Sequence, residues 1–541
     1  MKPWHIILAF VLFLIITCGA FAFYSTHLTA VLDHDSISYS LAIEKDSWTE
    51  IYHAHHLLYG YFKWVVWDVL KANGYEGRAL PVNQIFNAFF GALGVGLIFL
   101  VVRYFSGSYF LGFLASVFLA FANGYWYCAT FGGVRIMGTF FLLATFFAVS
   151  VFVYEKWLNF YQSVFLIIVI ALLHSLAVFC HQTNLMFAAV VCTVMLFKKD
   201  TLLKKVSYFY IYLVLLLSIV AGLYWYIGWK VFYCTTWERY HTWLTAYTSY
   251  GLWGKFTDKS IPDALIGVRA LFCGFIDGSI FVPGLGIRNN TALNTFINTS
   301  RILLLLFAGL SFWLFKKWKA VILGITVWIL LYVPFFIWWE PANMEFWLPM
   351  LPVILILAAL PLGLVWNSYR PVRLAIRIAT GLLLAYVVLV FAWYNYQNLI
   401  LPKTNPENNG YISAMNNLAE VREGPEDLVV IMGWDALRIN LNYYFSQDYI
   451  SIYFLSTKYR KDPDGFYDYI YKRISDKIKQ KHKVFIAKDV LWAKNFDDIN
   501  STYKSLEKDA FIKFFKEKYE QTPVKEGKNN YFYEAKIKTT R

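Results

Sequence analysis

The feature that most constrains the fold is a series of long apolar runs separated by short polar segments. The first run extends from Ile6 to Tyr24, and further runs lie near 84–102, 109–123, 136–153, 161–180, 183–197, 206–228, 301–315, 320–338, 346–366 and 375–395. About 20 apolar residues are enough for a helix to cross the hydrocarbon core of a bilayer. With 58% hydrophobic and only 16% charged residues, the composition excludes a string of soluble domains. We therefore predict a multi-span α-helical membrane protein with about 11 transmembrane helices.

The basic residues between the runs lie at run ends and set the expected orientation. With the N-terminus in the cytoplasm, the compact basic clusters all fall on the cytoplasmic side: Lys2, Arg103, Lys156, Lys198, Lys199, Lys204, Lys205, Lys316, Lys317, Lys319, Arg370, Arg373 and Arg377. This agrees with the positive-inside rule. The net charge of +14 is therefore explained by membrane orientation, with anionic membrane lipid as a secondary partner and no nucleic acid.

The same threading places the unusual polar segments on the outer face. They are the loop 27–83, the turns GYWYCATFGGVR, HQTN and WWEPANMEFW, the long loop 229–300, and everything after 396. In the loop 27–83, apolar and aromatic residues recur at three- and four-residue spacing, which predicts one or two interfacial amphipathic helices. We expect residues 1–396 to form a transmembrane domain, in a bacterial inner membrane, with its active site on the extracytoplasmic face.

After residue 396 the composition becomes charged and polar. The segments EDLVVIMG and KVFIAKDV are typical of buried strands, and DGFYDYIYKRISDKIKQ is typical of an amphipathic helix. Residues 397–541 are therefore predicted to form an extracytoplasmic, soluble α/β domain. The segment GWDALR after the first strand lacks the G-x-G-x-x-G pattern, so no nucleotide cofactor is expected.

Two carboxylates, Asp33 and Asp35, follow the first apolar run in the stretch LDHDSISY. Such groups near lipid need water, a cation or a function. A solvated loop start is one interpretation, but the spacing around His34 favours chemistry. One carboxylate would accept a proton from an attacking hydroxyl as general base. The other would hold Mg²⁺ or Mn²⁺ or orient the acceptor, and Asp35 is the candidate for the metal. Which residue is the base stays open, with a slight preference for Asp33 because it lies nearer the helix exit.

Histidines of the first outer loop are candidates for binding phosphate or sugar. The sequence HAHH places His53, His55 and His56 on the expected interfacial helix, where residues one and two apart diverge. A zinc site from these residues alone is therefore not expected. His55 and His56 are the better binding candidates because they lead directly into the apolar segment LLYGYF.

Further candidates lie at the outer ends of other runs. Arg135, in FGGVR, breaks the charge rule, and its guanidinium suits phosphate, with Gly132 and Gly133 allowing close approach of a ligand to the backbone. Contact with lipid headgroups is the alternative role for Arg135. The remaining donor-binding or cavity candidates are His181, Gln182, Lys255, Arg269, Arg288 and Glu345.

The pattern as a whole resembles the membrane-embedded C-type (GT-C) glycosyltransferases, the superfamily of protein O-mannosyltransferases, aminoarabinose transferases and RgtA/B/C/D-like bacterial enzymes. The resemblance rests on a first span followed at once by DHD, a long first outer loop with amphipathic helices, a multi-span core and an extracytoplasmic C-terminal domain. It covers the architecture of the whole chain, whereas its specific motif is short. DHD replaces the acidic pair DE of several subfamilies.

The resemblance implies an inverting transfer of sugar from a polyprenyl-phosphate donor to a glycan, lipid or protein acceptor. Asp33 or Asp35 would be the base or the acceptor-orienting group. A transporter or flippase of lipid-linked glycans is the main alternative, and it predicts ionisable residues deep in several helices and often a repeated half. A sensor or scaffold is less consistent with so many spans, since a few anchors would suffice.

Overall fold

A computed structural model of the chain describes residues 3–32, 34–245, 254–273, 306, 308–367, 371–433, 436–459, 462–493, 496, 506–525 and 530–538. The chain divides into two compact units. The membrane unit consists of Met1–Thr29 and Ala42–Thr404, and the second unit of Ala30–Leu41 and Asn405–Arg541. The boundary thus falls eight residues later than the expected 396. The short segment that carries Asp35 also groups with the C-terminal residues, which sequence alone did not indicate.

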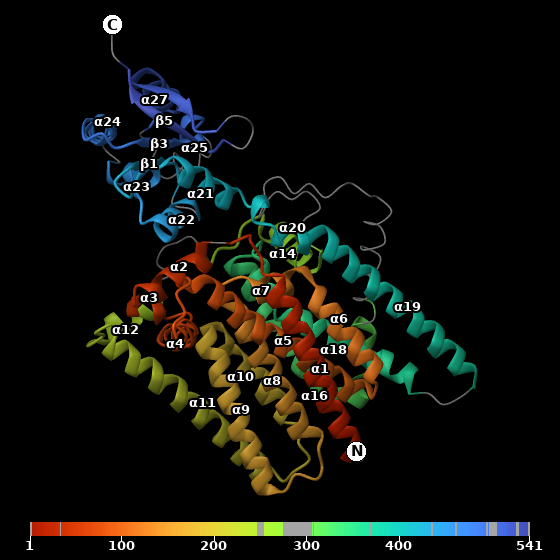
Figure 1. Cartoon of the computed structure of the whole chain (residues 1–541). Coiled ribbons are helices and arrows are strands. Elements are labelled where there is room, and N and C mark those ends of the chain that lie inside the picture. Colours follow the sequence, from red (N-terminus) through yellow and green to blue (C-terminus); the bar gives the residue numbers. More distant parts are fainter. Residues whose placement is uncertain are drawn as a thin grey trace. The chain divides into compact units, whose positions relative to one another are not determined.

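The membrane unit is built from helices (Figure 1). Those that include its long apolar runs are α1 (Pro3–Thr26), α5 (Ala79–Ser106), α6 (Tyr109–Phe121), α8 (Arg135–Tyr154), α9 (Phe160–Cys180), α10 (Phe187–Met195), α11 (Leu202–Lys230), α16 (Phe315–Trp339), α18 (Met350–Trp366) and α19 (Pro371–Asn395). Shorter helices and turns connect them: α3 (Trp48–Ile51), α4 (Tyr59–Ala72), α7 (Asn123–Thr130), η1 (Gln182–Met186), α12 (Trp237–Leu244), α14 (Ser260–Cys273), η2 (Ser311–Leu314), α17 (Met344–Trp347), η3 (Tyr396–Ile400) and α20 (Leu401–Thr404).

Eight helices of the described residues are long and apolar enough to cross a membrane, or nine if the pair α6 and α7, bent by 65°, counts as one span. Of the other two predicted runs, 183–197 forms a shorter apolar helix, Gln182–Met195. Of the run 301–315, the structure describes residues 306 and 308–315, which include the turn η2. The chain is thus an integral membrane protein, and the expected helical, multi-span class is confirmed.

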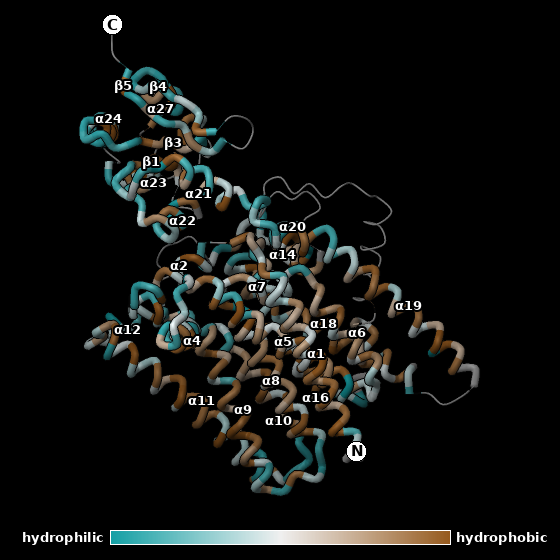
Figure 2. Tube along the Cα trace, in the orientation of Figure 1, coloured by the Kyte–Doolittle hydropathy of each residue, from teal (hydrophilic) through white to brown (hydrophobic). Residues whose placement is uncertain are grey.

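Helix α5 is surrounded by other helices of the membrane unit. It packs against α1, α6, α7, α8 and α18. In its most apolar window 67% of residues are buried, compared with 17% for α1, whose apolar side chains remain available to lipid. Figure 2 shows that hydrophobic residues, like those of α1, also run along α11 and α19. The absence of a side chain at Gly91 allows α7 to approach α5, since an added Cβ would meet the Cβ of Ala129.

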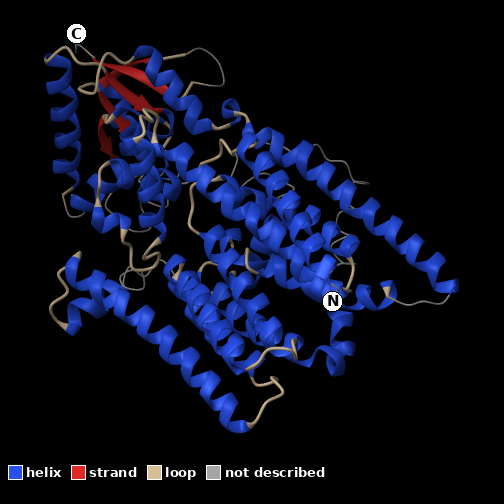
Figure 3. Cartoon of the chain, turned by 60° about the horizontal axis from the view of Figure 1, so that its bottom comes forward, coloured by secondary structure: helices blue, strands red, loops and turns tan. Residues whose placement is uncertain are grey.

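The second unit contains a five-stranded sheet of order β2-β1-β3-β5-β4 (Figure 3). Its strands are β1 (Leu428–Ile431), β2 (Asp448–Ser451), β3 (Val484–Ala487), β4 (Tyr519–Pro523) and β5 (Phe532–Ile537). Strand β1 pairs in parallel with β2 and β3, and β5 is antiparallel to β3 and β4. β1 and β3 are buried throughout, as their continuous apolar runs predict.

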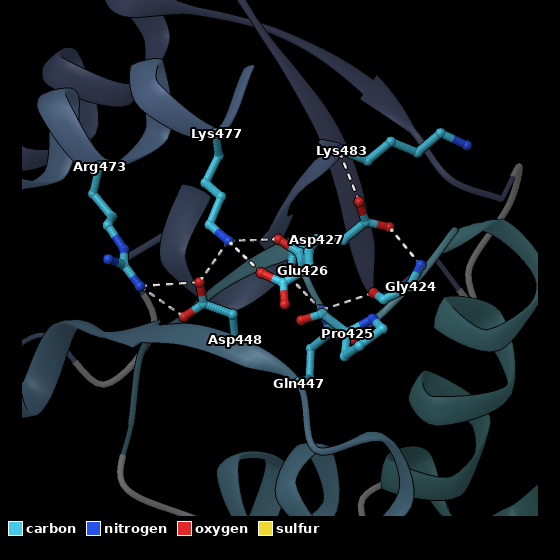
Figure 4. A network of polar contacts seen from close by, with 9 residues as sticks. All are labelled: Gly424, Pro425, Glu426, Asp427, Gln447, Asp448, Arg473, Lys477 and Lys483. Atoms are coloured by element: carbon cyan, nitrogen blue, oxygen red, sulfur yellow. Dashed lines mark hydrogen bonds and ion pairs between the residues drawn. The ribbon is translucent and has the colours of Figure 1, made fainter. Parts of the chain in front are cut away.

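The helices of the second unit are α2 (His34–Glu44, which continues into the membrane unit), α21 (Gly410–Val421), α22 (Ala436–Phe445), α23 (Ile452–Lys458), α24 (Pro463–Lys479), α25 (Lys488–Leu491) and α27 (Lys508–Lys518), with the turn η4 (Pro406–Asn408). The predicted α/β domain, with its two strands and amphipathic helix α24, is confirmed. A polar network, shown in Figure 4, connects the start of β1 to β2 and α24.

Candidate functional site

Three sequence-predicted residues from distant parts of the chain line one pocket of the membrane unit. Arg135 is the first residue of α8, His181 is the C-cap of α9, and Glu345 lies in α17. The pocket encloses about 300 Å³, including open solvent. Its other lining residues are Gly138, Thr139, Thr183, Asn184, Tyr332, Phe336, Phe346 and Pro349. Hydroxyl, amide and aromatic groups around one cation and one carboxylate suit a polar, partly anionic ligand.

The guanidinium of Arg135 is held against an aromatic ring. Its central carbon lies 3.8 Å from the ring centroid of Phe346, a cation–π contact that holds the planar cation against the ring. Arg135 also stands at the positive end of the α8 dipole. Both features favour an anion in this pocket.

A turn of three histidines lies beside this arginine. Residues 52–58 connect α3 to α4 and contain His53, His55 and His56. The ring centroids of His56 and His181 are 4.8 Å apart, and those of His55 and His181 are 6.4 Å apart. The expectation that HAHH lies on a helix is therefore wrong, and the rings converge because a turn does not impose helical divergence.

Backbone contacts with the end of α9 explain why a turn replaces the helix. The amide of Gln182 donates to the carbonyl of His55 at 3.0 Å, and the amide of Leu58 donates to the carbonyl of Phe179 at 3.1 Å. The side-chain amide of Gln182 also meets Nδ1 of His55 at 2.9 Å. These long-range bonds override the local helical pattern. Gln182, His55 and His56 are not among the pocket-lining residues, so of these neighbours only His181 lines the pocket.

Hydrogen bonds assign the protons of the neutral imidazoles. Nδ1 of His181 accepts a hydrogen bond from the backbone amide of Thr183 and lies 2.6 Å from the hydroxyl of the same residue. Nε2 of His181 therefore carries the proton. Nδ1 of His56 faces the carbonyl of Cys180 at 3.3 Å and must donate, which leaves its Nε2 as an acceptor. His181 is therefore suited to a phosphate oxygen and His56 to a hydroxyl.

Burial keeps these histidines uncharged. Desolvation, and then the neighbouring charges of His53 and Arg135, lower the pKa of His55 to about 3. Burial lowers the pKa of His56 and of His181 well below the ordinary value, with Arg135 contributing to both. At neutral pH the imidazoles act as hydrogen-bonding groups, and Arg135 supplies the positive charge.

The inner wall of the pocket is fixed by a buried hydrogen-bond chain. Nδ1 of His174 lies 2.6 Å from the hydroxyl of Tyr212, and its Nε2 lies 2.8 Å from the carbonyl of Asn184. The side chain of Asn184 donates to the carbonyl of Ala177 and accepts from Tyr332. Sequence reasoning did not select Asn184, Thr139 or Tyr332 as site residues. Of these three residues, only Asn184 lies in a segment that the sequence marks as polar and on the outer face, the HQTN turn.

Asp35 of the DHD stretch falls in the second unit. Asp35 lies in the first turn of α2, where the helix dipole favours a negative charge. Its side chain is 61% exposed, and its Oδ1 is 3.5 Å from Nδ1 of His34. Nε2 of His34 lies 3.5 Å from the guanidinium of Arg438 on α22. Asp33 lies outside the described residues.

The other basic candidates are not brought to the pocket. Lys255 and Arg269 are exposed, and neither is among the pocket-lining residues. Arg288 lies outside the described residues. Within the described part of the chain, no three His, Cys, Asp or Glu side chains are grouped so that they could hold a metal ion. The metal role of Asp35 therefore stays a prediction.

The sequence of this chain matches no protein-family model and no curated protein. Its fold, in contrast, is similar to that of several solved membrane proteins. ArnT from Cupriavidus metallidurans bound to undecaprenyl phosphate matches with a TM-score of 0.52 at 11% identity, over 99% of this chain and 98% of ArnT.

Two further structures extend the comparison. The Archaeoglobus fulgidus oligosaccharyltransferase tethered to an acceptor peptide matches with a TM-score of 0.54 at 13% identity, over 98% of this chain and 74% of that one. The arabinofuranosyltransferase AftD from Mycobacteria matches with a TM-score of 0.50 at 10% identity, over 98% of this chain but 40% of AftD. The chain therefore has the fold of the membrane-embedded C-type glycosyltransferases.

Proposed function

We propose that this chain is a membrane glycosyltransferase that moves a sugar from a polyprenyl-phosphate donor to an acceptor on the extracytoplasmic face. The observation that carries the proposal is the likeness, over nearly the whole of both chains, to ArnT bound to undecaprenyl phosphate. The pocket around Arg135 supplies the chemistry that such a donor requires. Its place at the outer ends of the predicted spans agrees with the distribution of basic clusters.

In this proposal Arg135 and Nε2–H of His181 bind the phosphate of the donor. The bond from the anomeric carbon to the phosphate oxygen breaks, and polyprenyl phosphate leaves with its electron pair. Negative charge develops on that leaving group, so fixed donors in a site of low dielectric stabilise the transition state more than the ground state. Hydroxyl and amide groups of Thr139, Asn184 and Tyr332 suit the sugar.

The acceptor hydroxyl attacks the anomeric carbon from the face opposite the phosphate, which inverts the configuration. Its proton passes to a carboxylate of the DHD stretch, Asp35 or Asp33, acting as general base. The exposure of Asp35 gives an acceptor access to it. Mg²⁺ or Mn²⁺ at Asp35 would orient the acceptor, but the described residues supply no complete ligand set, and no step depends on a metal.

The proposal is tested with purified protein and a panel of polyprenyl-phosphate sugars, by following both sugar transfer and release of polyprenyl phosphate. We expect transfer by the wild type and a loss of about 10²- to 10⁴-fold in Asp35→Asn or Asp33→Asn, whichever removes the general base. Asp68→Asn is the matched control, because Asp68 is an exposed carboxylate in the same outer segment.

Transfer that is undiminished in both variants would contradict the assignment of the base to DHD. Movement of the lipid across a bilayer without any new glycosidic bond would instead establish a flippase and reject the transferase. Added EDTA tests the metal separately, since a metal-dependent reaction stops on chelation and recovers with Mg²⁺ or Mn²⁺.

A further inference from the structure

Four consecutive backbone carbonyls, from Thr130 to Gly133, are bound by buried side chains of α4 and α5. Gln84 donates to the carbonyl of Thr130 at 2.7 Å. Asn87 donates to those of Phe131 at 2.6 Å and Gly133 at 2.7 Å. Lys63 donates to the carbonyl of Gly132 at 2.8 Å. The hydroxyl of Tyr59 lies 2.7 Å from Oδ1 of Asn87 and also faces the carbonyl of Gly133. We call Gln84, Asn87, Tyr59 and Lys63 the carbonyl clamp.

The carbonyls of the two glycines in FGGVR are therefore bound by the clamp. Both carbonyls point to protein donors, and the space that a Cβ of Gly133 would take is filled by the ring of Phe131. The carbonyls of Gly132 and Gly133 thus have protein partners, and the close approach of this backbone to a ligand stays a prediction.

Lys63 is the unusual member of the clamp, because its side chain is 0% exposed. A buried ammonium is costly unless other groups replace its hydration. Here the group lies 4.0 Å from the ring centroid of Tyr59 and bonds a carbonyl just beyond the C-terminal end of α7. The partial negative charge of helix-terminal carbonyls and the face of an aromatic ring both stabilise a cation.

The clamp joins the histidine turn to the segment that leads to Arg135 of the pocket. Tyr59 is the first residue of α4 and directly follows the histidine turn, residues 52–58. Gly133, the last clamped residue, stands two positions before Arg135. Any shift of the clamped backbone therefore changes the distance between Arg135 and the histidines.

We propose that Lys63, acting through the carbonyl clamp, positions Arg135 against the histidine turn before the donor phosphate binds. Lys63 is a positioning residue, because it is absent from the pocket lining and bonds the carbonyl of Gly132, three residues before Arg135. The proposal rests on the proposed function, since the group being positioned is the one assigned to donor phosphate. Preorganisation of this kind removes the cost of arranging the site at the moment of binding.

A second buried lysine supplies the matched control. Lys198 is 6% exposed and donates to the carbonyl of Phe152 at 2.7 Å, near the C-terminal end of α8. Its ammonium also lies 4.9 Å from the ring of Phe152. The two lysines thus make the same kinds of contact at opposite ends of the helix that begins with Arg135.

The test compares Lys63→Met, Lys63→Arg, Tyr59→Phe and Lys198→Met in the full-length protein. The readouts are thermal stability, the affinity for undecaprenyl phosphate in detergent, and KM and kcat for transfer. We expect Lys63→Met to weaken undecaprenyl phosphate binding and raise KM, by up to about 100-fold, as displacement of a binding group by about 1 Å does. Lys63→Arg restores part of the affinity, and Tyr59→Phe, which removes no charge, moves affinity in the same direction as Lys63→Met. Lys198→Met lowers stability without changing affinity.

Equal losses of stability in Lys63→Met and Lys198→Met, with unchanged affinity and KM in both, would overturn the positioning role while leaving the proposed function intact. If Lys63→Met does not fold, the milder Tyr59→Phe decides, and unchanged affinity in that variant overturns the proposal. A wild type that neither binds undecaprenyl phosphate nor transfers sugar would reject the proposed function and the inference together.

Discussion

The carbonyl clamp and the polar network of the second unit use polar side chains in different ways. In the clamp, a lysine and neutral side chains bind backbone carbonyls. In the network of Figure 4, charges meet charges: Lys477 and Arg473 each lie 3.0 Å from the carboxylate of Asp448. Asp427 accepts from the backbone amides of Glu423 and Lys483 at 2.7 and 2.8 Å.

The difference shows where a substitution should affect binding and where it should affect only stability. Ion pairs of the second unit lie near water, and water solvates either charged partner when the other is removed. Clamp groups are enclosed, and each controls the position of a backbone segment that leads into the pocket. The comparison therefore predicts that substitutions in the clamp change the binding of the donor phosphate, whereas substitutions in the network of Figure 4 change local stability alone.

Among the substitutions that test this comparison, Arg135→Met should have the largest effect. Loss of the guanidinium is expected to cost about 2–4 kcal/mol of lipid-phosphate binding, a weakening of about 30- to 1,000-fold. The measurement is titration of the detergent-solubilised protein with undecaprenyl phosphate. Arg135→Lys should recover only part of the affinity, because an ammonium lacks the planar fork of donors. Wild-type affinity in Arg135→Met would show that this pocket does not bind the lipid phosphate.

Asp427→Asn should have the next largest effect, on stability alone. Asp427 is 1% exposed, and the change turns an acceptor into a donor that faces backbone amides. We expect a loss of about 1.5–3 kcal/mol from the second unit, detected as faster hydrogen exchange in β1 and β3. At temperatures where the unit stays folded, the affinity for undecaprenyl phosphate should equal that of wild type. A changed affinity would break the contrast between the two regions.

The third effect is a loss of stability in acid. Unfolded histidine titrates near pH 6.5, whereas burial lowers the pKa of His55 to about 3. Between these values the unfolded state binds more protons, so this contribution is fully present above pH 6.5 and is lost as the pH falls toward 3. The loss for His55 is about 1.4 kcal/mol per pH unit. Thermal unfolding at pH 7.5 and 5.5 measures it, and His55→Gln should reduce the difference. An equal difference in His55→Gln would show that His55 does not contribute.

Glu423→Gln should have the smallest effect. Its ion pair with Lys483 spans 2.9 Å, but the side chain of Glu423 is 65% exposed. Such a surface pair contributes less than about 1 kcal/mol, and added salt should reduce even that. Thermal unfolding of the variant in low and high salt provides the check. A loss of stability as large as that in Asp427→Asn would show that the exposed ion pair stabilises the second unit as much as the buried carboxylate does.

The sequence predicted the gathering of Arg135, His181 and Glu345 because charge topology places all three at the outer ends of spans. It predicted β1, β3 and α24 because their apolar patterns reflect local burial. It did not predict the histidine turn, whose backbone is organised by bonds to α9. Nor did it select the clamp, since Lys63 and Asn87 become buried only when α4, α5 and α7 pack together. Such long-range partners leave no periodic signal.

The most direct test of the account is a cryo-EM structure of the full chain with undecaprenyl phosphate. We predict density for the phosphate in the pocket, within hydrogen-bond distance of the guanidinium of Arg135 and Nε2 of His181. A phosphate bound elsewhere, with this pocket empty, would contradict the assignment of the donor site.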